Sequence, residues 1–374
     1  MKTESAWWWN FTRIIRMTTR KPYHTRNIAI ALLAASMVVL GACSGDPYRL
    51  PGEVHLKNIK RLTKTGQNAE GYFSFDEKRI VFQSQPRGAE CDRIYVMNVD
   101  GTNRRPVSSG LGSTTCSYFL PGDRTIVYAS THLEYRDCPP PPDRSRGYVW
   151  KLYDSYDIFV SRVDGSDVRR LTKSPGYDAE ATVSPAGDAI VFTSMRDGDP
   201  ELYRMDIDGK NVKRLTKSPG YDGGAFFSWD GKKIVFRASR PSNPREKQVY
   251  DELVRDKLVR PSVLELYIMD SDGTNIKRIT NFGKASFAPF WHPDNKRIIF
   301  SSNLGAKNRR NFDLYIINID GTGLKRITYN GTFDGFPVFS RDGKKLIFAS
   351  NRFNEKKGET NLFIADWIDS PAGE

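Results

Sequence analysis

Six short apolar stretches recur along the chain, separated by polar segments in a repeating order. Each combines β-branched and aromatic residues over six or seven positions, a composition typical of buried β-strands. They read RIVFQS (79–84), TIVYAS (125–130), AIVFTS (189–194), KIVFRAS (233–239), RIIFSS (297–302) and KLIFAS (345–350). A second strand-like run, such as LYRMDI or LYIINI, follows each stretch. The pattern therefore predicts six copies of one β-unit.

Tight turns separate the predicted strands within each copy. Asp-Gly pairs, which supply the positive φ of a short hairpin, occur at 100–101, 164–165, 208–209, 272–273 and 320–321. Two intervals between these pairs are longer than the others, and they indicate insertions at 131–155 and 241–262. Four consecutive prolines predict a polyproline segment in the first insertion. Ser242-Asn243-Pro244 predicts the start of a short helix in the second.

The two ends of the repeat region complement each other. Five copies are followed by a fourth strand of the type VKRLTKS, but the sixth ends at Asp366-Trp367 without one. The segment IKRLTKT (59–65) precedes the first copy and can supply that strand. Such a pairing closes a ring of blades without an exposed sheet edge. The sequence thus predicts an all-β, six-bladed β-propeller over residues 55–367, closed by an N-terminal strand that completes the last blade, with a tail at 368–374.

Residues 1–42 have the pattern of a secretory signal peptide. Basic residues precede the uncharged run IAIALLAASMVVLGA, which is shorter than the roughly 20 residues of a membrane-spanning helix. The run ends in LGAC, which resembles a bacterial lipobox and implies that Cys43 is acylated and begins a tether at 43–54. Ser44 follows the acylated position and favours the periplasmic side of the outer membrane of the cell envelope.

The repeat consensus FSxDGKxIxFxSxRxxxxxLYxMxxDGxxxxRLT resembles that of the TolB-like propellers over residues 55–367. The resemblance implies a WD-like-repeat scaffold in the bacterial envelope that binds a protein or peptide partner, and we expect the face that carries the insertions to do so. TolB-type proteins also carry an N-terminal α/β domain. This chain has no such domain between Cys43 and its first predicted strand, so an equivalent role does not follow from the repeat alone.

One polar residue stands at an equivalent place before the first strand of every copy. The six are Asn68, Thr114, Asp178, Asp222, Ser286 and Asp334, and aromatic residues precede three of them, namely Tyr177, Tyr221 and Phe333. Because equivalent positions surround the axis of a propeller, we expect a ring of oxygen atoms at the channel mouth that binds a basic peptide loop or, as a less favoured occupant, Ca²⁺. The alternative is that each Asp caps its own turn, and both interpretations stay open.

Three cysteines follow Cys43. In an oxidising envelope compartment, two of them are expected to form a disulfide and the third to stay free. We favour Cys91–Cys138, which joins two loops, with Cys91–Cys116 as the main alternative. No CxxC-type spacing is present, so the sequence predicts no metal site among them.

Composition narrows the function without identifying a ligand. With 39% hydrophobic residues the chain can bury a core, and its net charge of +13 is spread without a basic stripe or a nucleic-acid motif. No GxSxG elbow, P-loop or histidine cluster indicates catalysis. We expect a non-enzymatic monomer with a protein or peptide partner, a lipid link to the membrane and no other cofactor. The alternative is a carbohydrate-binding or carbohydrate-active propeller, suggested by the aromatic-Asp pairs and by Arg144, Arg146, Tyr148 and Trp150.

Overall fold

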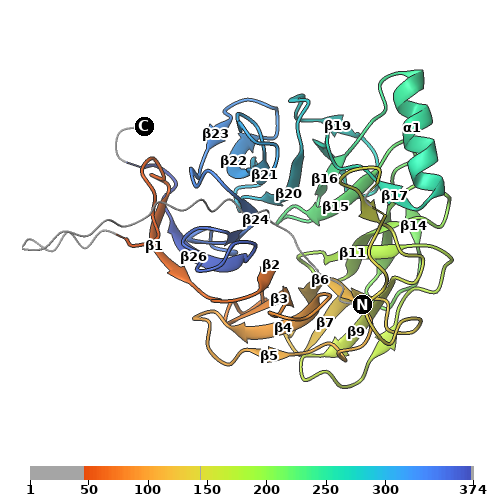
Figure 1. Cartoon of the computed structure of the whole chain (residues 1–374), viewed down its shortest axis with the longest axis horizontal. Coiled ribbons are helices and arrows are strands. Elements are labelled where there is room, and N and C mark those ends of the chain that lie inside the picture. Colours follow the sequence, from red (N-terminus) through yellow and green to blue (C-terminus); the bar gives the residue numbers. More distant parts are fainter. Residues whose placement is uncertain (1–45, 144, 372–374) are drawn as a thin grey trace, which may run out of the picture. The chain divides into compact units, whose positions relative to one another are not determined.

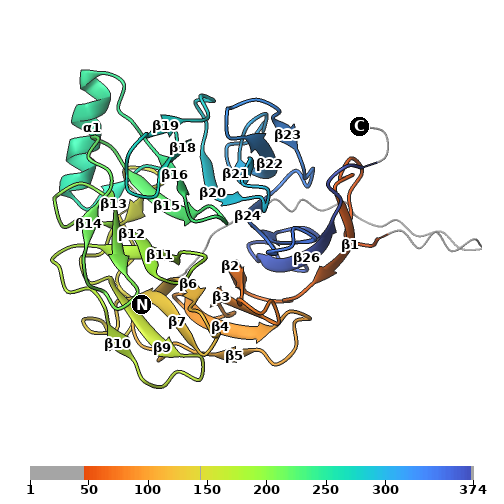
Figure 2. The ribbon, with the colours of Figure 1, turned by 180° about the vertical axis from the view of Figure 1, so that it is seen from behind.

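A computed structural model describes residues 46–143 and 145–371. Six four-stranded antiparallel sheets surround a central axis, and the chain passes around the ring from β1 to β26 (Figures 1 and 2). The six-bladed β-propeller predicted from the repeats is confirmed. Within the described part of the chain, no helix combines the length and the apolar character that a membrane span requires.

Each blade runs from an inner strand beside the axis to an outer strand at the rim. Blade one comprises β2 (Gln67–Phe73), β3 (Arg79–Gln85), β4 (Arg93–Asn98) and β5 (Arg105–Pro106). Blade two comprises β6 (Thr114–Phe119), β7 (Thr125–Ser130), β9 (Asp157–Arg162) and β10 (Arg169–Arg170). Blade three comprises β11 (Asp178–Val183), β12 (Ala189–Ser194), β13 (Glu201–Asp206) and β14 (Lys213–Arg214). Blades four and five comprise β15 (Asp222–Phe227), β16 (Lys233–Ala238), β18 (Glu265–Asp270) and β19 (Lys277–Arg278); and β20 (Ser286–Trp291), β21 (Arg297–Ser302), β22 (Asp313–Asn318) and β23 (Lys325–Arg326).

Blade six combines strands from both ends of the chain. It contains β24 (Asp334–Phe339), β25 (Lys345–Ser350), β26 (Asn361–Trp367) and, at its outer edge, β1 (Leu56–Arg61). β1 pairs antiparallel with β26, so that Leu56 lies opposite Trp367 and Arg61 lies opposite Phe363. The predicted closure by an N-terminal strand is therefore confirmed.

The core lies between the blades, where the second strands are packed on both faces. β12, for example, is buried at all six positions. An aromatic ring occupies the fourth position of every second strand and is at most 2% exposed: Phe82, Tyr128, Phe192, Phe236, Phe300 and Phe348. Burial on both faces explains why these strands are nearly continuous apolar runs and not strictly alternating ones.

A hydroxyl that follows each outer strand extends the short outer ladder. In every blade it accepts a hydrogen bond, 2.9–3.0 Å long, from the backbone N–H of the second residue of the third strand. The acceptors are Thr63, Ser108, Thr172, Thr216, Thr280 and Thr328. Thr63 serves blade six, so the N-terminal segment supplies both the strand and the hydroxyl that the last repeat lacks.

The two insertions pair with each other. β8 (Trp150–Lys151), from the first, forms a two-stranded sheet with β17 (Leu258–Val259), from the second. The predicted helix is present as α1 (Pro244–Arg255), and the Asn243 side chain accepts a hydrogen bond from Glu246 N–H at its start, at 3.0 Å. The helix lies at the periphery of the ring (Figure 1).

Residues 46–54 pack against the propeller, which corrects the expectation of a free tether over this part of 43–54. The Asp46 carboxylate accepts a hydrogen bond from the Ile59 backbone N–H at 2.5 Å. The Tyr48 ring packs edge-on against Phe353 and Phe363, and Glu53 is fully buried. The segment thus fixes the approach to β1.

Deleting residues 46–61 removes β1 and exposes the edge of β26. The buried side chains of Leu56 and Ile59, each contributing about 1.5–3 kcal/mol, are lost with it. We expect a melting temperature at least roughly 5–10 °C lower, or aggregation, in a thermal scan. A control chain that begins at residue 46 should melt like the parent. Equal midpoints for all three proteins would show that β1 does not close the ring.

Candidate functional site

The six polar residues that begin the inner strands do not form an open ring at the channel mouth. Asn68, Thr114, Asp178, Asp222, Ser286 and Asp334 each have 0% exposed surface. This corrects the expected ring of ligands for a basic peptide or Ca²⁺, because fully buried oxygen atoms do not reach a molecule outside the ring. The two tyrosines that precede Asp178 and Asp222 are buried as well, and Phe333 is half-buried.

Each of the three aspartates is paired with an arginine of its own blade. The arginine stands two residues after the second strand, so that its side chain can reach back to the start of the neighbouring inner strand. The pairs are Asp178–Arg196 at 3.2 Å, Asp222–Arg240, and Asp334–Arg352 at 2.9 Å. A buried carboxylate without a cation would be strongly unfavourable. The Ser-x-Arg element of the repeat consensus was the available signal for the pairs in blades three and six.

Blade six adds a second carboxylate to its pair. Both terminal nitrogens of Arg352 donate to Glu53 at 2.9 Å, and one of them also donates to Asp334. All three side chains are at most 1% exposed. Glu53 belongs to the segment before β1, so this ion cluster also holds the N-terminal segment on blade six.

Blades three and four share a pair of buried carboxyl groups. Burial raises the pKa of Asp222 well above its ordinary value, the neighbouring Glu201 raises it further and Arg240 opposes the rise. Asp222 Oδ2 and Glu201 Oε2 have no other partner among the described residues, and a proton between the two groups would satisfy both oxygens. These groups are structural because neither is accessible from outside.

The residue two positions after each of the six polar residues has an unusual backbone. Its φ lies between 48° and 59° in all six blades, including the one in which it is a glycine. In every blade the pairing between the first and second strands shifts register there. The residues are Glu70, Cys116, Glu180, Gly224, Ala288 and Phe336. A bulge of this kind re-aims a side chain. Here it brings Glu70 of blade one next to Cys116 of blade two, and burial raises the pKa of Glu70 to about 7, although Cys116 and Arg237 lower it.

A charged network crosses from blade three to blade four. Glu180 accepts hydrogen bonds from the Tyr221 hydroxyl at 3.0 Å and from Gly224 N–H at 3.0 Å, and it pairs with Arg237. A Cβ at Gly223 would lie 2.1 Å from the Tyr221 hydroxyl, and one at Gly224 would lie 2.1 Å from Arg237 Nη1. Both glycines are therefore needed to leave room for the network, which links two blades on the insertion side.

The residue four positions after the polar residue is aromatic in four of the six blades. Ring centroids lie 5.2 Å apart for Tyr72 and Tyr118, 5.7 Å for Tyr72 and Phe226, and 5.2 Å for Phe226 and Phe290. Rings at these distances are in contact. They separate the polar network on the insertion side from the opposite mouth of the channel.

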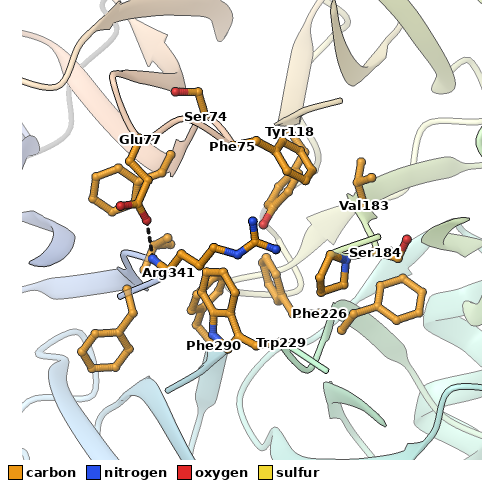
Figure 3. A pocket seen from close by; sticks show the side chains of 15 residues that line it. Ser74, Phe75, Glu77, Tyr118, Val183, Ser184, Phe226, Trp229, Phe290 and Arg341 are labelled. Carbon is orange, nitrogen blue, oxygen red and sulfur yellow. Dashed lines mark hydrogen bonds between the residues drawn. The ribbon is translucent and has the colours of Figure 1, made fainter. Parts of the chain in front are cut away.

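The opposite mouth, formed by the turns between first and second strands, contains a recess with a cavity volume of about 60 Å³. Residues from all six blades line it, and Figure 3 shows Phe75, Tyr118, Trp229, Phe290 and Arg341 around the opening. We expected binding on the insertion face. The apolar recess instead lies on the other face, and sequence reasoning missed it because its residues are scattered over the strands and turns of six blades.

Hydrogen bonds between neighbouring turns hold the rim of this turn-side recess. Asp123 of blade two accepts from the backbone N–H groups of Phe75 and Asp76 in blade one, at 2.7 and 2.9 Å. Glu77 of blade one accepts from the Arg341 backbone N–H in blade six (Figure 3). The recess is therefore assembled before any partner arrives, which lowers the entropic cost of binding.

Among the described residues, the cysteines and histidines form no second site. Cys91 and Cys138, the favoured pair, are joined by a disulfide with a Cα–Cα distance of 5.8 Å, and Cys116 is free.

The residues that suggested carbohydrate binding make other contacts. Arg146 forms an ion pair with Asp256 at 2.6 Å, and the Arg237 guanidinium lies over the Trp150 ring. Arg144 lies outside the described residues. No group of three metal-ligating side chains is present in residues 46–143 and 145–371.

A ring of six four-stranded blades, with its last blade completed from the N-terminal side, defines a β-propeller. The chain belongs to the TolB beta propeller domain family, whose model matches residues 142–258 and 264–370. Over 45 residues it is 49% identical to the Tol-Pal system protein TolB of Bordetella pertussis, a match that covers 12% of this chain and 10% of that protein. The chain therefore matches only a short part of this curated relative.

Two solved structures share the fold. TolB from Acinetobacter baumannii matches with a TM-score of 0.54 and 20% identity over 73% of this chain and 57% of its own. A proposed TolB from Agrobacterium tumefaciens matches with a TM-score of 0.56 and 18% identity over 83% of this chain and 97% of its own. At these identities the likeness shows the fold alone.

Replacing Arg352 with Gln leaves Glu53 and Asp334 buried without their cation. We expect a loss of about 3–5 kcal/mol in the free energy of unfolding, measured by denaturant titration. As a control, Arg162→Gln removes an exposed arginine that pairs with Asp164 at 3.6 Å and should leave the unfolding midpoint unchanged. Equal midpoints for the two variants would contradict a structural role for the buried cluster.

Proposed function

We propose that this protein is a lipid-anchored envelope protein whose propeller binds a protein partner at the turn-side recess. The Bordetella pertussis relative is named as part of the Tol-Pal system, which supports an envelope role for this chain. The recess gives the role a location on the molecule. Its composition and its size both favour a protein over a small molecule.

The size of the recess is the observation that carries the proposal. Small-molecule sites commonly enclose about 300–1,000 Å³. The recess encloses about 60 Å³, well below that range. It has room for one side chain of limited size and none for a substrate molecule. A partner can insert one residue there and spread the rest of its contacts over the surrounding turns.

The lining of the recess also suits protein recognition. Phe75 and Trp229 are partly exposed rings on the rim, and Phe290 and Phe339 are buried beneath it. Aromatic and arginine side chains provide most of the energy at protein interfaces, particularly where they surround a small preformed pocket. A single apolar recess at the centre of a face therefore fits the role of an anchor site.

The residues that suggested a carbohydrate-acting propeller are engaged in other contacts. The aspartates of the aromatic-Asp pairs are buried in ion pairs, and Arg146 is paired with Asp256. Glu180 and Arg237, the charged groups nearest to Trp150, are bonded to each other. In the described structure, these groups are engaged in structural contacts.

Trp229→Ala removes the largest ring on the rim, and it tests the location directly. A display selection from a random peptide library should enrich binders on the wild type, and the variant should bind them about 2 kcal/mol more weakly, or roughly 30-fold in Kd. Tyr148→Ala, which removes a ring 70% exposed on the insertion side, is the matched control and should leave binding unchanged. Loss of binding with Tyr148→Ala but not with Trp229→Ala would move the site to the insertion face.

The lipid anchor rests on Cys43, which lies outside the described residues. Acylation there would hold the protein on the periplasmic side of the outer membrane. We expect mass spectrometry of the mature N-terminus to show a diacylglycerol-modified Cys43, and Cys43→Ala to move the protein out of the membrane fraction. A wild-type protein without lipid would refute the anchor while leaving the binding site untouched.

A further inference from the structure

Arg341 differs from the other residues at its place in the repeat. In each blade this place is the second residue after the inner strand. It holds an apolar residue in the other five blades. These residues are Phe75, Pro121, Pro185, Trp229 and Pro293. The rim of the recess thus carries one cation among apolar neighbours, and that cation comes from blade six.

The guanidinium of Arg341 makes no hydrogen bond or ion pair in the described structure, and its side chain is exposed. Figure 3 shows its side chain extending across the recess toward Tyr118. Burial raises the pKa of Tyr118 to about 12, and the charge of Arg341 opposes this rise. Glu77 is the nearest carboxylate in the lining, and its bond goes to the backbone N–H of Arg341 and not to the guanidinium. By contrast, Arg196, Arg240 and Arg352 are all ion-paired.

An unpaired guanidinium beside apolar walls is well placed to recognise a carboxylate. Its planar, fixed donors match the two oxygens of a carboxylate, and the pair strengthens as water is excluded. The apolar walls accept a side chain without polar groups. The two features lie in one recess of about 60 Å³, so one short segment can engage both.

The surrounding turns argue against a polyanion such as nucleic acid. Asp76, Asp230 and Asp342 stand on three of these turns, are exposed, and have lowered pKa values. The serine hydroxyl of the same turn contributes to the lowering in each case. Lys78, Lys232 and Lys344 stand beside these aspartates and also lower their pKa values, so the turns carry both signs of charge and offer no continuous positive surface to an extended negative chain.

We propose that the partner presents a carboxylate next to an apolar side chain, with the carboxylate on Arg341 and the apolar side chain in the recess. This inference rests on the proposed function and adds the chemistry of the partner. The carboxylate can come from an Asp or Glu side chain or from the C-terminus of the partner chain. Both sources present the same group to Arg341.

Four synthetic peptide pools test the inference on the immobilised protein. Each pool has randomised flanks and a fixed apolar residue (Phe, Leu, Met or Trp). Three are amidated and place Glu, Gln or Lys after that residue, and the fourth ends at the apolar residue with a free carboxylate. The retained fraction is measured for the wild type, Arg341→Gln, Trp229→Ala and Lys344→Gln. Lys344 is a matched control because its side chain is 80% exposed on the same turn.

The wild type should retain the Glu pool or the free-carboxylate pool roughly tenfold or more above the Gln pool, with the difference falling as salt is added. The preferred pool identifies the source of the carboxylate. Arg341→Gln should abolish the difference and Lys344→Gln should preserve it.

Three results would overturn the inference. They are equal retention of the Glu, Gln and free-carboxylate pools, preference for the Lys pool, and an unchanged preference in Arg341→Gln. If retention still depends on Trp229 in any of these cases, the recess remains the binding site and only the carboxylate assignment fails. If no pool depends on Trp229, the proposed function fails as well.

Discussion

The burial of an aspartate at the start of an inner strand constrains the architecture more than any other interaction. Asp178, Asp222 and Asp334 lie where neighbouring blades meet, and each needs an arginine from its own blade to offset the loss of hydration. In blade six the same arginine also pairs with Glu53 and so fixes the segment that leads into β1. In blade six, charge compensation and ring closure therefore depend on one residue, Arg352.

The channel has two unlike ends because its middle is filled by aromatic rings. On the insertion side, Glu180 pairs with Arg237, and the glycines beside them leave them room. On the turn side, the rings leave a small apolar recess whose one guanidinium has no partner in the described structure. A site that binds a partner keeps some of its interactions unsatisfied until the partner arrives. The turn side meets that condition through the guanidinium of Arg341.

The sequence predicts the fold well, because six copies of a strand pattern and a displaced fourth strand leave one ring topology. It also indicates the helix at Asn243, through local capping chemistry. The polar residues at the strand starts misled the site assignment, since polarity at an equivalent position does not show which way a side chain faces. The recess was not predictable, because Phe75, Trp229 and Arg341 occupy a variable position and meet only after the ring closes.

The central claim is that the partner contacts the turn face. It is tested most directly by photo-crosslinking in intact cells, with a photoreactive residue at Ala186, an exposed position next to Pro185 of the recess, or at Tyr148 on the insertion side. The account predicts a specific adduct from position 186 that disappears when Trp229→Ala is added, and none from position 148. An adduct from position 148 that is insensitive to Trp229→Ala, with none from 186, would contradict it.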